Sequence, residues 1–342
     1  MIEPVRRSFV VPRPERTVGP GRRPSFSVVI PAYEVAAFAS EAVESVLSQT
    51  FPPREVIVCD DGSTDDLAGA LARYEGQIVL IRKANGGLAS ARNAGVRIAS
   101  GDFVAFLDAD NVFLPEYLEA LGELAVLRPD LDILTTDAYL ERAGEIYGRY
   151  YRGKARFVAD DQRRGIIHQH FIFGNGAIRR EALLAVGGYD ETVVAEDTDL
   201  FVRMILGGSR AGLVDEPLCV YRIRAGSLAS NRPRMLRAAT VVLERARTHP
   251  SLTRDELRYL RRELAAQRRE AALAEAEAAL RGLASHARWR CLKVAFGPHR
   301  YSLASRVSAL AGAAAPRAAG RYLERRERTS GRSRLALRTY GR

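Results

Sequence analysis

Residues 26–140 alternate between short apolar runs and segments of helical periodicity, and this alternation constrains the fold more than any other feature. The apolar runs predict strands at Phe26–Ile30, Glu55–Cys59, Ile78–Arg82 and Asp102–Leu107. The segments between and after them predict helices at Phe38–Gln49, Leu88–Ala99 and Pro115–Leu127. Strands that alternate with helices build a mostly parallel sheet covered on both faces. We therefore predict an α/β fold with a mostly parallel sheet flanked by helices.

The pattern becomes mixed beyond residue 140. It predicts a strand or hairpin at Tyr147–Tyr151, a strand at Phe173–Arg179, helices at Arg180–Val186 and Asp197–Leu206, and short strands at Ala211–Val214 and Leu218–Ile223. After the second strand, Ser63 or Thr64 is expected to cap the next helix. From Pro233 onward the chain is rich in Ala and Arg and predicts helices.

The charge of the chain is divided unevenly along its length. Residues 1–230 carry 26 Lys+Arg and 32 Asp+Glu, whereas residues 231–342 carry 26 and 9. This asymmetry indicates two parts with separate roles. We expect a disordered Pro/Arg-rich leader at 1–24, an α/β domain at 25–230, and a helical, basic C-terminal region at 231–342.

The three cysteines, Cys59, Cys219 and Cys291, match neither a zinc motif nor a disulfide framework. This usage fits a reducing cytoplasm. No run of about 18 apolar residues is present, so no transmembrane helix is expected. The leader has no apolar core and is not expected to be a signal peptide.

Acidic residues collect where three of the predicted structural segments begin or end. Asp60-Asp61 follow the second strand, Asp108-Ala109-Asp110 follow the fourth, and Glu196-Asp197 open a helix. The carboxyl ends of parallel strands form the ligand-binding edge of such sheets. These acids would repel one another without a cation or hydrogen-bond donors. Two carboxylates suit a divalent cation and a diphosphate, and neither common Gly-rich phosphate loop is present.

Five motifs in this order resemble family 2 glycosyltransferases of the GT-A, Rossmann-like fold. They are Val29-Ile30-Pro31-Ala32-Tyr33, Asp60-Asp61-Gly62-Ser63-Thr64-Asp65, Asn85-Gly86-Gly87 through Ala91-Arg92-Asn93, Asp108-Ala109-Asp110 and Glu196-Asp197. The resemblance covers about residues 26–225. It implies transfer of a sugar from a nucleotide diphosphate sugar to an acceptor hydroxyl, with inversion at the anomeric carbon. It also implies a non-processive enzyme, because the Gln-x-x-Arg-Trp motif of the processive members is absent.

The resemblance assigns a nucleotide site to eight residues, most of which follow predicted strands. The implied nucleotide-binding residues are Pro31, Ala32, Tyr33, Glu34, Asp61, Arg92, Asp108 and Ala109. Tyr33 would pack against the base, and Asp61 would accept a hydrogen bond from it. Arg92 would lie on the base or phosphate side.

The same resemblance assigns the metal, the base and the acceptor side. Asp110, together with Asp108, would bind Mn²⁺ or Mg²⁺, which stabilises the leaving diphosphate. Asp197 would be the catalytic base that takes the proton of the poorly nucleophilic acceptor hydroxyl. Gly174, Asn175 and Glu196 would line the acceptor side.

The chain departs from the family where many members carry a His after a Tyr-Arg pair. Here the segment reads Tyr221-Arg222-Ile223-Arg224, and Arg224 takes the place of the His. An arginine does not bind a metal but pairs well with phosphate. One hypothesis is therefore that Arg224 clamps the diphosphate, and the alternative is a solvated loop residue. His168 and His170 share one face of a strand, and we interpret them as cleft-wall histidines rather than ligands.

Each acidic motif also has a purely structural interpretation. Asp60-Asp61-Gly62 could be a turn, and Asp197 a helix-start acid that answers the helix dipole. A catalytically inactive nucleotide-sugar-binding or scaffold protein is the alternative function. A nucleotidyltransferase is disfavoured because no Gly-rich basic loop follows the first strand.

The basic C-terminal region leaves two alternatives open. Trp289, Leu292 and Phe296 lie at helical spacing among basic residues, which suits a helix on the surface of an anionic membrane. Alternatively, these helices pack against the body or form a homodimer contact. Nucleic acid is not an expected partner, because no recognised binding motif accompanies the arginines. The expected partners are a UDP-, GDP- or dTDP-sugar and a glycan, lipid or small-molecule acceptor, in the cytoplasm or at the inner membrane face.

Overall fold

The computed structural model describes residues 10–11, 23–224, 231–281, 286–296, 301 and 303–330. The chain divides into two compact units, Met1–Arg224 and Ala225–Arg342. The first unit is an α/β domain and the second is helical. Each unit is described by itself below.

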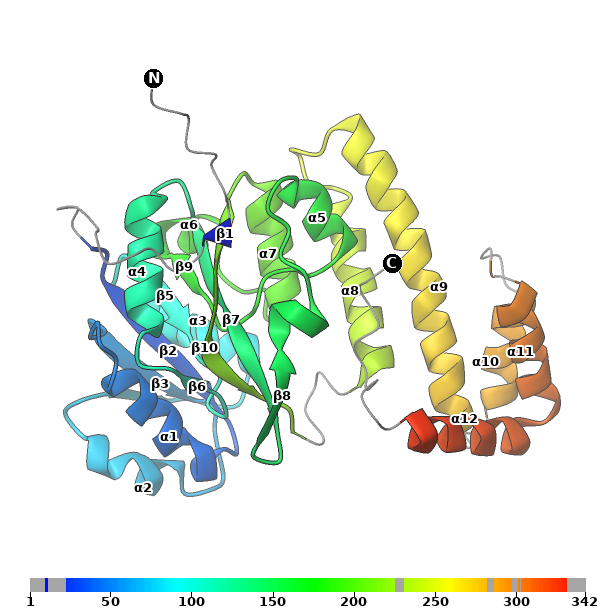
Figure 1. Cartoon of the computed structure of the whole chain (residues 1–342), viewed down its shortest axis with the longest axis horizontal. Helices are drawn as coiled ribbons and strands as arrows, with labels where there is room; N and C mark the ends of the chain where they lie inside the picture. The colour runs from blue at the N-terminus through cyan, green and yellow to red at the C-terminus, as the bar shows by residue number, and fades with distance from the viewer. Residues whose placement is uncertain are drawn as a thin grey trace. The chain divides into compact units, whose positions relative to one another are not determined.

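The first unit is built on one sheet of mostly parallel strands (Figure 1). Its strands run in the order β1-β10-β7-β9-β5-β2-β3-β4, with β6 paired to β10 and β8 to β7. The strands are β1 (Val10–Val11), β2 (Phe26–Ala32), β3 (Glu55–Asp60), β4 (Val79–Arg82), β5 (Phe103–Phe106), β6 (Val112–Phe113), β7 (Ile133–Arg142), β8 (Glu145–Arg149), β9 (Ala177–Arg179) and β10 (Ala211–Arg222). Strands β5, β2, β3 and β4 are mutually parallel, whereas β9 is antiparallel to both of its neighbours. The predicted α/β class with a mostly parallel sheet is confirmed.

Helices cover both faces of this sheet because its central strands are apolar on both sides. The helices of the unit are α1 (Ala36–Leu47), α2 (Leu67–Leu71), α3 (Leu88–Ile98), α4 (Tyr117–Leu127), α5 (Gln162–His168), α6 (Arg180–Ala185) and α7 (Glu196–Leu206), with short helical turns at Ala72–Tyr74 and Tyr150–Lys154. All seven residues of β2 are buried. Phe26, Val28 and Ile30 belong to one core cluster with side chains of α1 and α4. Val29, which points to the opposite face, lies under α3.

The structure corrects the predicted start of α2. The cap is Asp66, whose carboxylate accepts a hydrogen bond from Gly69 N at 3.0 Å. Ser63 N instead donates to Asp60 Oδ1 at 2.8 Å, and Thr64 N donates to Glu34 Oε1 at 2.7 Å. These bonds hold the residues after β3 in a turn, so the helix begins later than Ser63 or Thr64 predicts.

Three other segments also differ from the predictions. Strand β10 is one strand rather than two, with register shifts around Pro217, which has no N–H for the ladder. The strand expected at Phe173–Arg179 is shortened to Ala177–Arg179. Helix α5 was not predicted, and His168 ends it rather than lying on a strand. The hairpin alternative near Tyr147 is confirmed, since β7 and β8 pair across Ala143 and Gly144, both at positive φ.

The leader and the linker are described only in part. Val10 and Val11 of the predicted disordered leader pair in parallel with Leu213 and Val214 of β10. The other residues up to 22 lie outside the described residues, as do residues 225–230, next to the predicted boundary.

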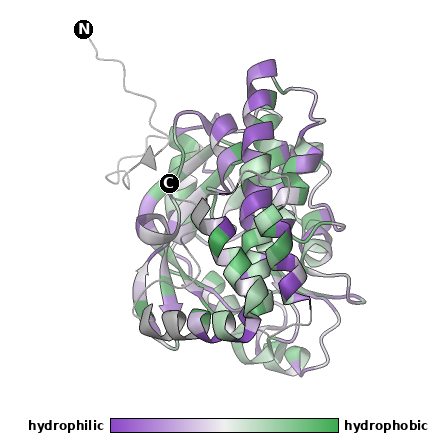
Figure 2. Ribbon diagram, turned by 90° about the vertical axis from the view of Figure 1, so that its right-hand side faces the viewer, coloured by the Kyte–Doolittle hydropathy of each residue, from purple (hydrophilic) through white to green (hydrophobic). Residues whose placement is uncertain are grey.

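The second unit consists of helices with mixed polar and apolar residues (Figure 2). They are α8 (Arg232–Ala246), α9 (Arg254–Arg281), α10 (Ala287–Phe296), α11 (Leu303–Ala314) and α12 (Pro316–Ser330). Their core contains Leu280, Cys291 and Val294. In the part of the chain that the structure describes, no helix is long and apolar enough to cross a membrane.

The contact of α3 with the sheet gives a first prediction. A Cβ atom on Gly95 would lie 2.4 Å from Val29 Cγ1 and 3.2 Å from Cys59 Sγ. We expect Gly95→Ala to destabilise the protein by about 1–3 kcal/mol, because α3 has to move away from β2. Urea denaturation measures this difference.

Gly122→Ala is the matched control for this prediction. Gly122 is also buried inside a helix, but its added Cβ would meet only Phe26, at 3.7 Å. We expect this variant to be as stable as the native chain or about 1 kcal/mol more stable, because alanine favours a helix. Equal stability of the two variants would contradict the close approach.

Candidate active site

The carboxyl ends of β2, β3 and β5 meet at one edge of the sheet, and the acidic motifs follow them there. Parallel pairing sets Val29 beside both Ile57 and Phe106, so the three strands end at a common edge. Asp61 follows β3, and Asp108 follows β5. Glu196 and Asp197 open α7, and Arg92 lies on α3. The fold thus brings motifs from distant parts of the sequence to one site.

Asp61 organises the loop that precedes α3. The residue is 2% exposed. Its Oδ1 accepts a hydrogen bond from Lys83 Nζ at 2.6 Å, and its Oδ2 accepts one from Gly87 N at 2.7 Å. Gly86 N lies 3.0 Å from Oδ1. A lysine and two backbone amides therefore hold the carboxylate and fix the loop. Sequence reasoning missed Lys83, since only the fold brings it to Asp61.

The residues after β2 form the neighbouring wall. Pro31 and Ala32 belong to β2 and pair with Cys59 and Asp60 of β3. The Tyr33 side chain is half exposed. Glu34 adopts a φ of 53°, and its Oε1 accepts hydrogen bonds from Thr64 N and Oγ1 at 2.7 and 2.8 Å. Glu34 therefore holds the turn after Asp61, and Tyr33 presents an aromatic surface beside it.

Arg92 joins the end of β5 to the start of α7. Its Nη2 lies 2.8 Å from Asp108 Oδ1, and its Nη1 lies 2.8 Å from Glu196 Oε1. The guanidinium is buried and lies over the Tyr189 ring, 5.3 Å from the centroid. Tyr189 in turn packs edge-on against Phe106 of β5. One arginine thus holds together two of the predicted site residues.

Asp110 lies beside Arg224 and Arg222. Its Oδ2 is 3.2 Å from Arg224 Nη1, and its carbonyl oxygen is 3.4 Å from Arg222 Nη1. The Arg224 guanidinium also lies over the Phe38 ring at 4.6 Å. Arg224 is therefore tied to Asp110 in this structure. Ala109, between the two aspartates, is buried.

The segment with Gly174 and Asn175, predicted from the sequence to line the acceptor side, approaches Asp197 closely. A Cβ on Gly174 would lie 3.4 Å from Asp197 Oδ2, and Asn175 Oδ1 accepts a hydrogen bond from Asp108 N at 3.3 Å. Asp197 Oδ1 accepts from Thr198 N at 2.6 Å. His170 Nε2 lies 3.9 Å from Asp197 Oδ2. His170 is therefore a neighbour of the predicted base. The sequence predicted a position in a cleft wall but not this contact.

The two neighbouring acids of α7 have pKa values displaced in opposite directions. Burial, followed by the charge of Asp197, raises the pKa of Glu196 to about 7, although Arg92 opposes the rise. Burial also raises the pKa of Asp197, but His170, Arg92 and the hydrogen bonds from Thr198 together bring that pKa below its ordinary value. Asp197 is thus the member of the pair that stays ionised at neutral pH.

The donor set of Asp108 and Asp110 fits a hard divalent cation that also binds substrate. Burial and the neighbouring Asp108 raise the pKa of Asp110, as expected for two adjacent acids, and Arg224 partly offsets the rise. Among the described residues, no group of three or more His, Cys, Asp or Glu side chains could hold a metal by itself. Mg²⁺ commonly takes one or two carboxylates and completes its shell with phosphates and water. The residues present fit that arrangement.

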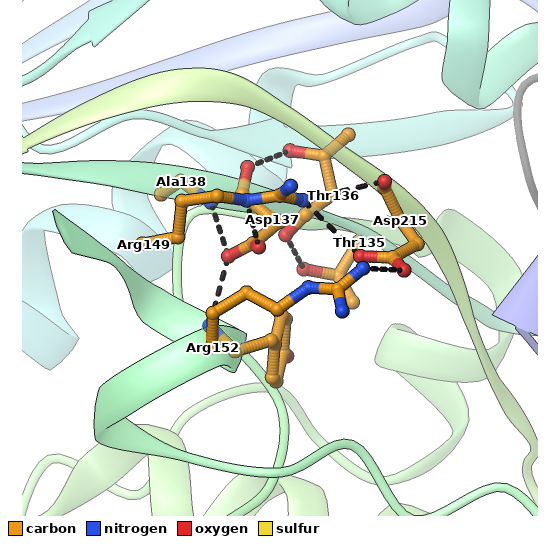
Figure 3. A network of polar contacts seen from close by, with 8 residues as sticks. Thr135, Thr136, Asp137, Ala138, Arg149, Arg152 and Asp215 are labelled. Carbon is orange, nitrogen blue, oxygen red and sulfur yellow. Dashed lines mark hydrogen bonds and ion pairs between the residues drawn. The ribbon is translucent and has the colours of Figure 1, made fainter.

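A polar network joins Asp137 to Arg149, Arg152 and Asp215 (Figure 3). Asp137 is fully buried, and its Oδ2 accepts from Arg149 Nε at 2.8 Å. Arg149 and Arg152 both pair with Asp215. Asp137 Oδ1 accepts from Tyr151 N at 2.9 Å, and the Tyr151 hydroxyl accepts from Phe173 N at 2.8 Å. The network therefore reaches the residue before Gly174.

Comparison with known proteins agrees with this geometry. Residues 27–187 match the model of the family described as Glycosyl transferase family 2. This part of the chain belongs to glycosyltransferase family 2. The match ends before Glu196, so it covers the first four motifs and not the Glu-Asp pair.

Similar proteins occur in several bacteria. The glycosyltransferase EpsJ of Bacillus subtilis is 28% identical over 224 residues, 60% of this chain and 63% of EpsJ. The O-antigen biosynthesis protein RfbC of Myxococcus xanthus is 35% identical over 217 residues, 61% of this chain and 16% of RfbC. The matched region thus spans less than two thirds of either relative.

Solved structures share the GT-A fold of the domain. The mannosyltransferase PcManGT from Pyrobaculum calidifontis, in complex with GDP-Man and Mn²⁺, has a TM-score of 0.58 at 20% identity and covers 91% of this chain and 88% of its own. Residues 1–349 of S. aureus TarS, in complex with UDP-GlcNAc, give a TM-score of 0.56 at 19% identity and cover 90% of this chain and 92% of their own. At these identities the likeness shows the fold.

The displaced pKa of Glu196 predicts that the stability of the protein depends on pH. The folded pKa of about 7 lies above the ordinary 4.5, so the folded state binds the proton more tightly than the unfolded state. The stability contributed by neutral Glu196 is present below pH 4.5 and is lost as the pH rises toward 7. We expect Glu196→Gln to abolish this loss, which is about 1–3 kcal/mol between pH 5 and pH 8.

Urea denaturation of both proteins at pH 5 and pH 8 measures the effect. Glu181→Gln, a change of the same kind on α6, is the control and is expected to keep the native pH dependence. A Glu196→Gln variant that loses as much stability as the native protein between the two pH values would contradict the assignment.

Proposed function

We propose that the protein is a metal-dependent, inverting, non-processive glycosyltransferase that uses a nucleotide diphosphate sugar. The observation that carries this proposal is the bridge made by Arg92 between Asp108 and Glu196. This bridge supports a single site for the predicted donor-side acid and the predicted base, Asp197, which follows Glu196 in the chain. No observation favours the alternative of an inactive binding protein.

The donor is proposed to be a UDP-, GDP- or dTDP-sugar. The exposed Tyr33 ring supports stacking on the base, and the Pro31–Glu34 wall lies beside Asp61. The fold neighbours that bind UDP-GlcNAc and GDP-Man support a nucleotide sugar of this class. Lys83, Gly86 and Gly87 already donate hydrogen bonds to the Asp61 carboxylate. In its proposed hydrogen bond with the base, one Asp61 oxygen would therefore accept from the base and from one of these donors at the same time.

The metal is proposed to be Mn²⁺ or Mg²⁺, held by Asp110 and Asp108. When bound, the ion would offset the charge of the leaving diphosphate. Arg224 is proposed to add a second cationic group on the diphosphate, because its guanidinium already reaches the Asp110 carboxylate. Binding of the ion would then redistribute Arg224 from Asp110 toward phosphate oxygens.

Asp197 is proposed to act as the general base. The acceptor oxygen forms a bond to the anomeric carbon while the bond from that carbon to the diphosphate oxygen breaks, and the leaving nucleotide keeps the electron pair. The acceptor proton passes to Asp197, whose low pKa keeps it ionised before the reaction. Gly174 leaves room beside Asp197 Oδ2 for the acceptor hydroxyl. One attack of this kind inverts the anomeric carbon.

The acceptor is proposed to be a growing cell-surface glycan, a glycolipid or a small molecule, reached in the cytoplasm. Curated relatives named for O-antigen biosynthesis and as a chondroitin synthase support a polysaccharide. Gly174 and Asn175, with Glu196 behind them, are the proposed acceptor-side residues.

Calorimetric titration of UDP, GDP, dTDP and CDP, with and without Mn²⁺, tests the proposal. We expect one nucleotide to bind and to need the metal, and Asp110→Asn to weaken binding at least tenfold because a metal ligand is lost. Asp197→Asn is expected to keep this affinity but to transfer no sugar. Arg224→Ala should weaken the diphosphate at least tenfold while leaving the monophosphate unaffected.

Asp130→Asn is the control, because Asp130 also pairs with arginines but lies outside the site. Equal affinities with and without metal would contradict the metal assignment, and no nucleotide binding at all would leave the scaffold alternative. Diphosphate affinity unchanged in Arg224→Ala would exclude the clamp.

We further propose that the second unit contacts an anionic membrane surface through α10. Trp289 and Phe296 are 61% and 72% exposed, and Lys293 lies between them in the chain with its Nζ over the Trp289 ring. The opposite face of the helix, with Cys291 and Val294, is buried in the unit. Exposed aromatics beside basic residues suit a lipid headgroup region, and residues 231–342 carry the excess of Lys and Arg.

Vesicle sedimentation with the full chain tests this contact. We expect binding to vesicles containing phosphatidylglycerol but not to pure phosphatidylcholine, weakened several-fold by high salt. The double variant Trp289→Ser, Phe296→Ser should lose binding, whereas Leu127→Ser, at an apolar position of the first unit that is 53% exposed, should not. Unchanged sedimentation of the double variant would overturn the proposal, and loss of a dimer on ultracentrifugation would favour the homodimer instead.

A further inference from the structure

His170 contacts the residues of α7 that surround the proposed base. Its Nδ1 lies 2.8 Å from Thr198 Oγ1, and its Nε2 faces both the carbonyl oxygen of Ile172 and Asp197 Oδ2. The ring packs edge-on against Phe201, also on α7. With only 16% of its side chain exposed, His170 is fixed on several sides.

The partners of the two ring nitrogens define where the ring holds its protons. A carbonyl oxygen only accepts hydrogen bonds, so Nε2 carries a hydrogen toward Ile172 in either charge state. Nδ1 faces a hydroxyl, which both donates and accepts. A neutral ring therefore accepts a hydrogen bond from Thr198, and a protonated ring donates one to it. Histidine can hold either charge state near neutral pH.

The Thr198 hydroxyl connects the protonation state of His170 to Asp197. Thr198 Oγ1 lies 2.8 Å from His170 Nδ1 and 3.3 Å from Asp197 Oδ1. The hydroxyl has one hydrogen, so it donates to Asp197 when His170 is protonated and to His170 when the ring is neutral. In both cases Thr198 N holds Asp197 Oδ1 at 2.6 Å, which leaves Oδ2 next to Gly174.

We propose that His170 is a positioning residue that sets, through Thr198, the orientation and the basicity of the Asp197 carboxylate. This inference rests on the proposed role of Asp197 as the base. A protonated His170 places a positive charge and a redirected hydroxyl beside Asp197 and makes it a weaker base. A neutral His170 removes both effects and makes Asp197 a stronger one.

Other titratable groups also face Asp197, and their effects on its pKa have to be distinguished from that of His170. They are Arg92 on α3, Glu196 on α7, Tyr189 before α7 and Tyr221 on β10. Arg92 stays charged at every pH of the experiment, so its effect on the pKa of Asp197 is constant. Burial and nearby acids raise the pKa of both tyrosines well above neutral, so they stay uncharged. Glu196, with its pKa of about 7, changes its charge near neutral pH.

Two substitutions of His170 separate its two contacts. Asparagine reaches the place of Nδ1 and can keep the bond to Thr198, but it removes Nε2 and the charge. Glutamine reaches the place of Nε2 and can keep the bond to Ile172, but it removes the bond to Thr198. Carbon-13 NMR of labelled Asp carboxyl groups, without substrate, follows the titration of Asp197, assigned by its disappearance in Asp197→Asn.

We expect the titration midpoint of Asp197 to rise by about one pH unit in both His170 variants, since the cation is lost in each. His168→Asn, two residues earlier, is the matched control and should leave the midpoint in place. The shift should also appear when the native His170 and the His170 variants are compared in a Glu196→Gln background, and this result excludes Glu196 as its source. An unchanged midpoint in both His170 variants, with native melting temperatures, would overturn the proposal.

Thr198 provides a second pair of variants in case His170 is needed for folding. Thr198→Val keeps the shape of the side chain and removes the hydroxyl, so the Asp197 midpoint should rise. Thr198→Ser restores the hydroxyl and should restore the midpoint. Equal midpoints in the Val and Ser variants would contradict the link through Thr198.

Turnover, once a donor and acceptor are identified, gives an independent reading. If Asp197 is the base, the acid limb of the kcat profile moves to higher pH with the NMR midpoint, and the donor KM does not change. A purely structural role would instead lower kcat at every pH with no movement of the limb, and this result would overturn the inference. A shifted NMR midpoint without any detectable transfer would support the coupling of His170 to Asp197 and count against the proposed function.

Discussion

The buried guanidinium of Arg92 is the interaction on which the site depends. It lies between Asp108 and Glu196, at 2.8 Å from each, and Asp197 stands next in the chain. Without a cation, three acids brought this close in a partly buried site would repel one another, and each would be costly to desolvate. Because this arginine of α3 contacts Asp108, which follows β5, and Glu196 of α7, it also ties these three elements together. The Tyr189 ring beneath it and Phe106 behind that ring fill the space that a shorter side chain would leave.

A second anchor supports the part of the site that has no regular structure. Residues 171–176 form no strand, so their backbone groups need other partners. The Tyr151 hydroxyl donates to Phe171 O at 3.0 Å and accepts from Phe173 N, and the Tyr117 hydroxyl donates to Asn175 O. Tyr151 is itself fixed by Asp137, which Arg149 neutralises. Buried tyrosines and the ion pair of the buried Asp137 with Arg149 thus support the segment in which Gly174 lies beside Asp197.

The sequence was most informative where local pattern and burial agree. The apolar runs of β2, β3 and β5 predicted strands because these strands are buried on both faces, and the acids after them could be assigned to one edge from parallel pairing alone. Strand β7 has Thr135, Thr136 and Asp137 at its centre and gave no apolar run, although all three are fully buried. The contacts of Lys83 with Asp61 and of His170 with Thr198 join residues 22 and 28 positions apart, and no local pattern signals them. The late start of α2 depended on the carboxylates of Asp60 and Glu34, which accept hydrogen bonds from Ser63 N and Thr64 N. These bonds hold the two residues in a turn instead of at the start of a helix.

The Glu-Asp pair at the start of α7 shows why neighbouring acids are not interchangeable. Successive residues of a helix point about 100° apart, as 3.6 residues per turn requires, so the two carboxylates meet different surroundings. Glu196 points to Arg92 and is 12% exposed at its side chain, whereas Asp197 points to Gly174 and His170 and is 31% exposed. The buried acid has the raised pKa and the more exposed one has the lowered pKa. Of the two carboxylates, the ionised one is the second, and it lies beside Gly174 and His170. The order Glu then Asp thus suits the surroundings, since the longer side chain reaches Arg92 and the shorter one stays beside Gly174.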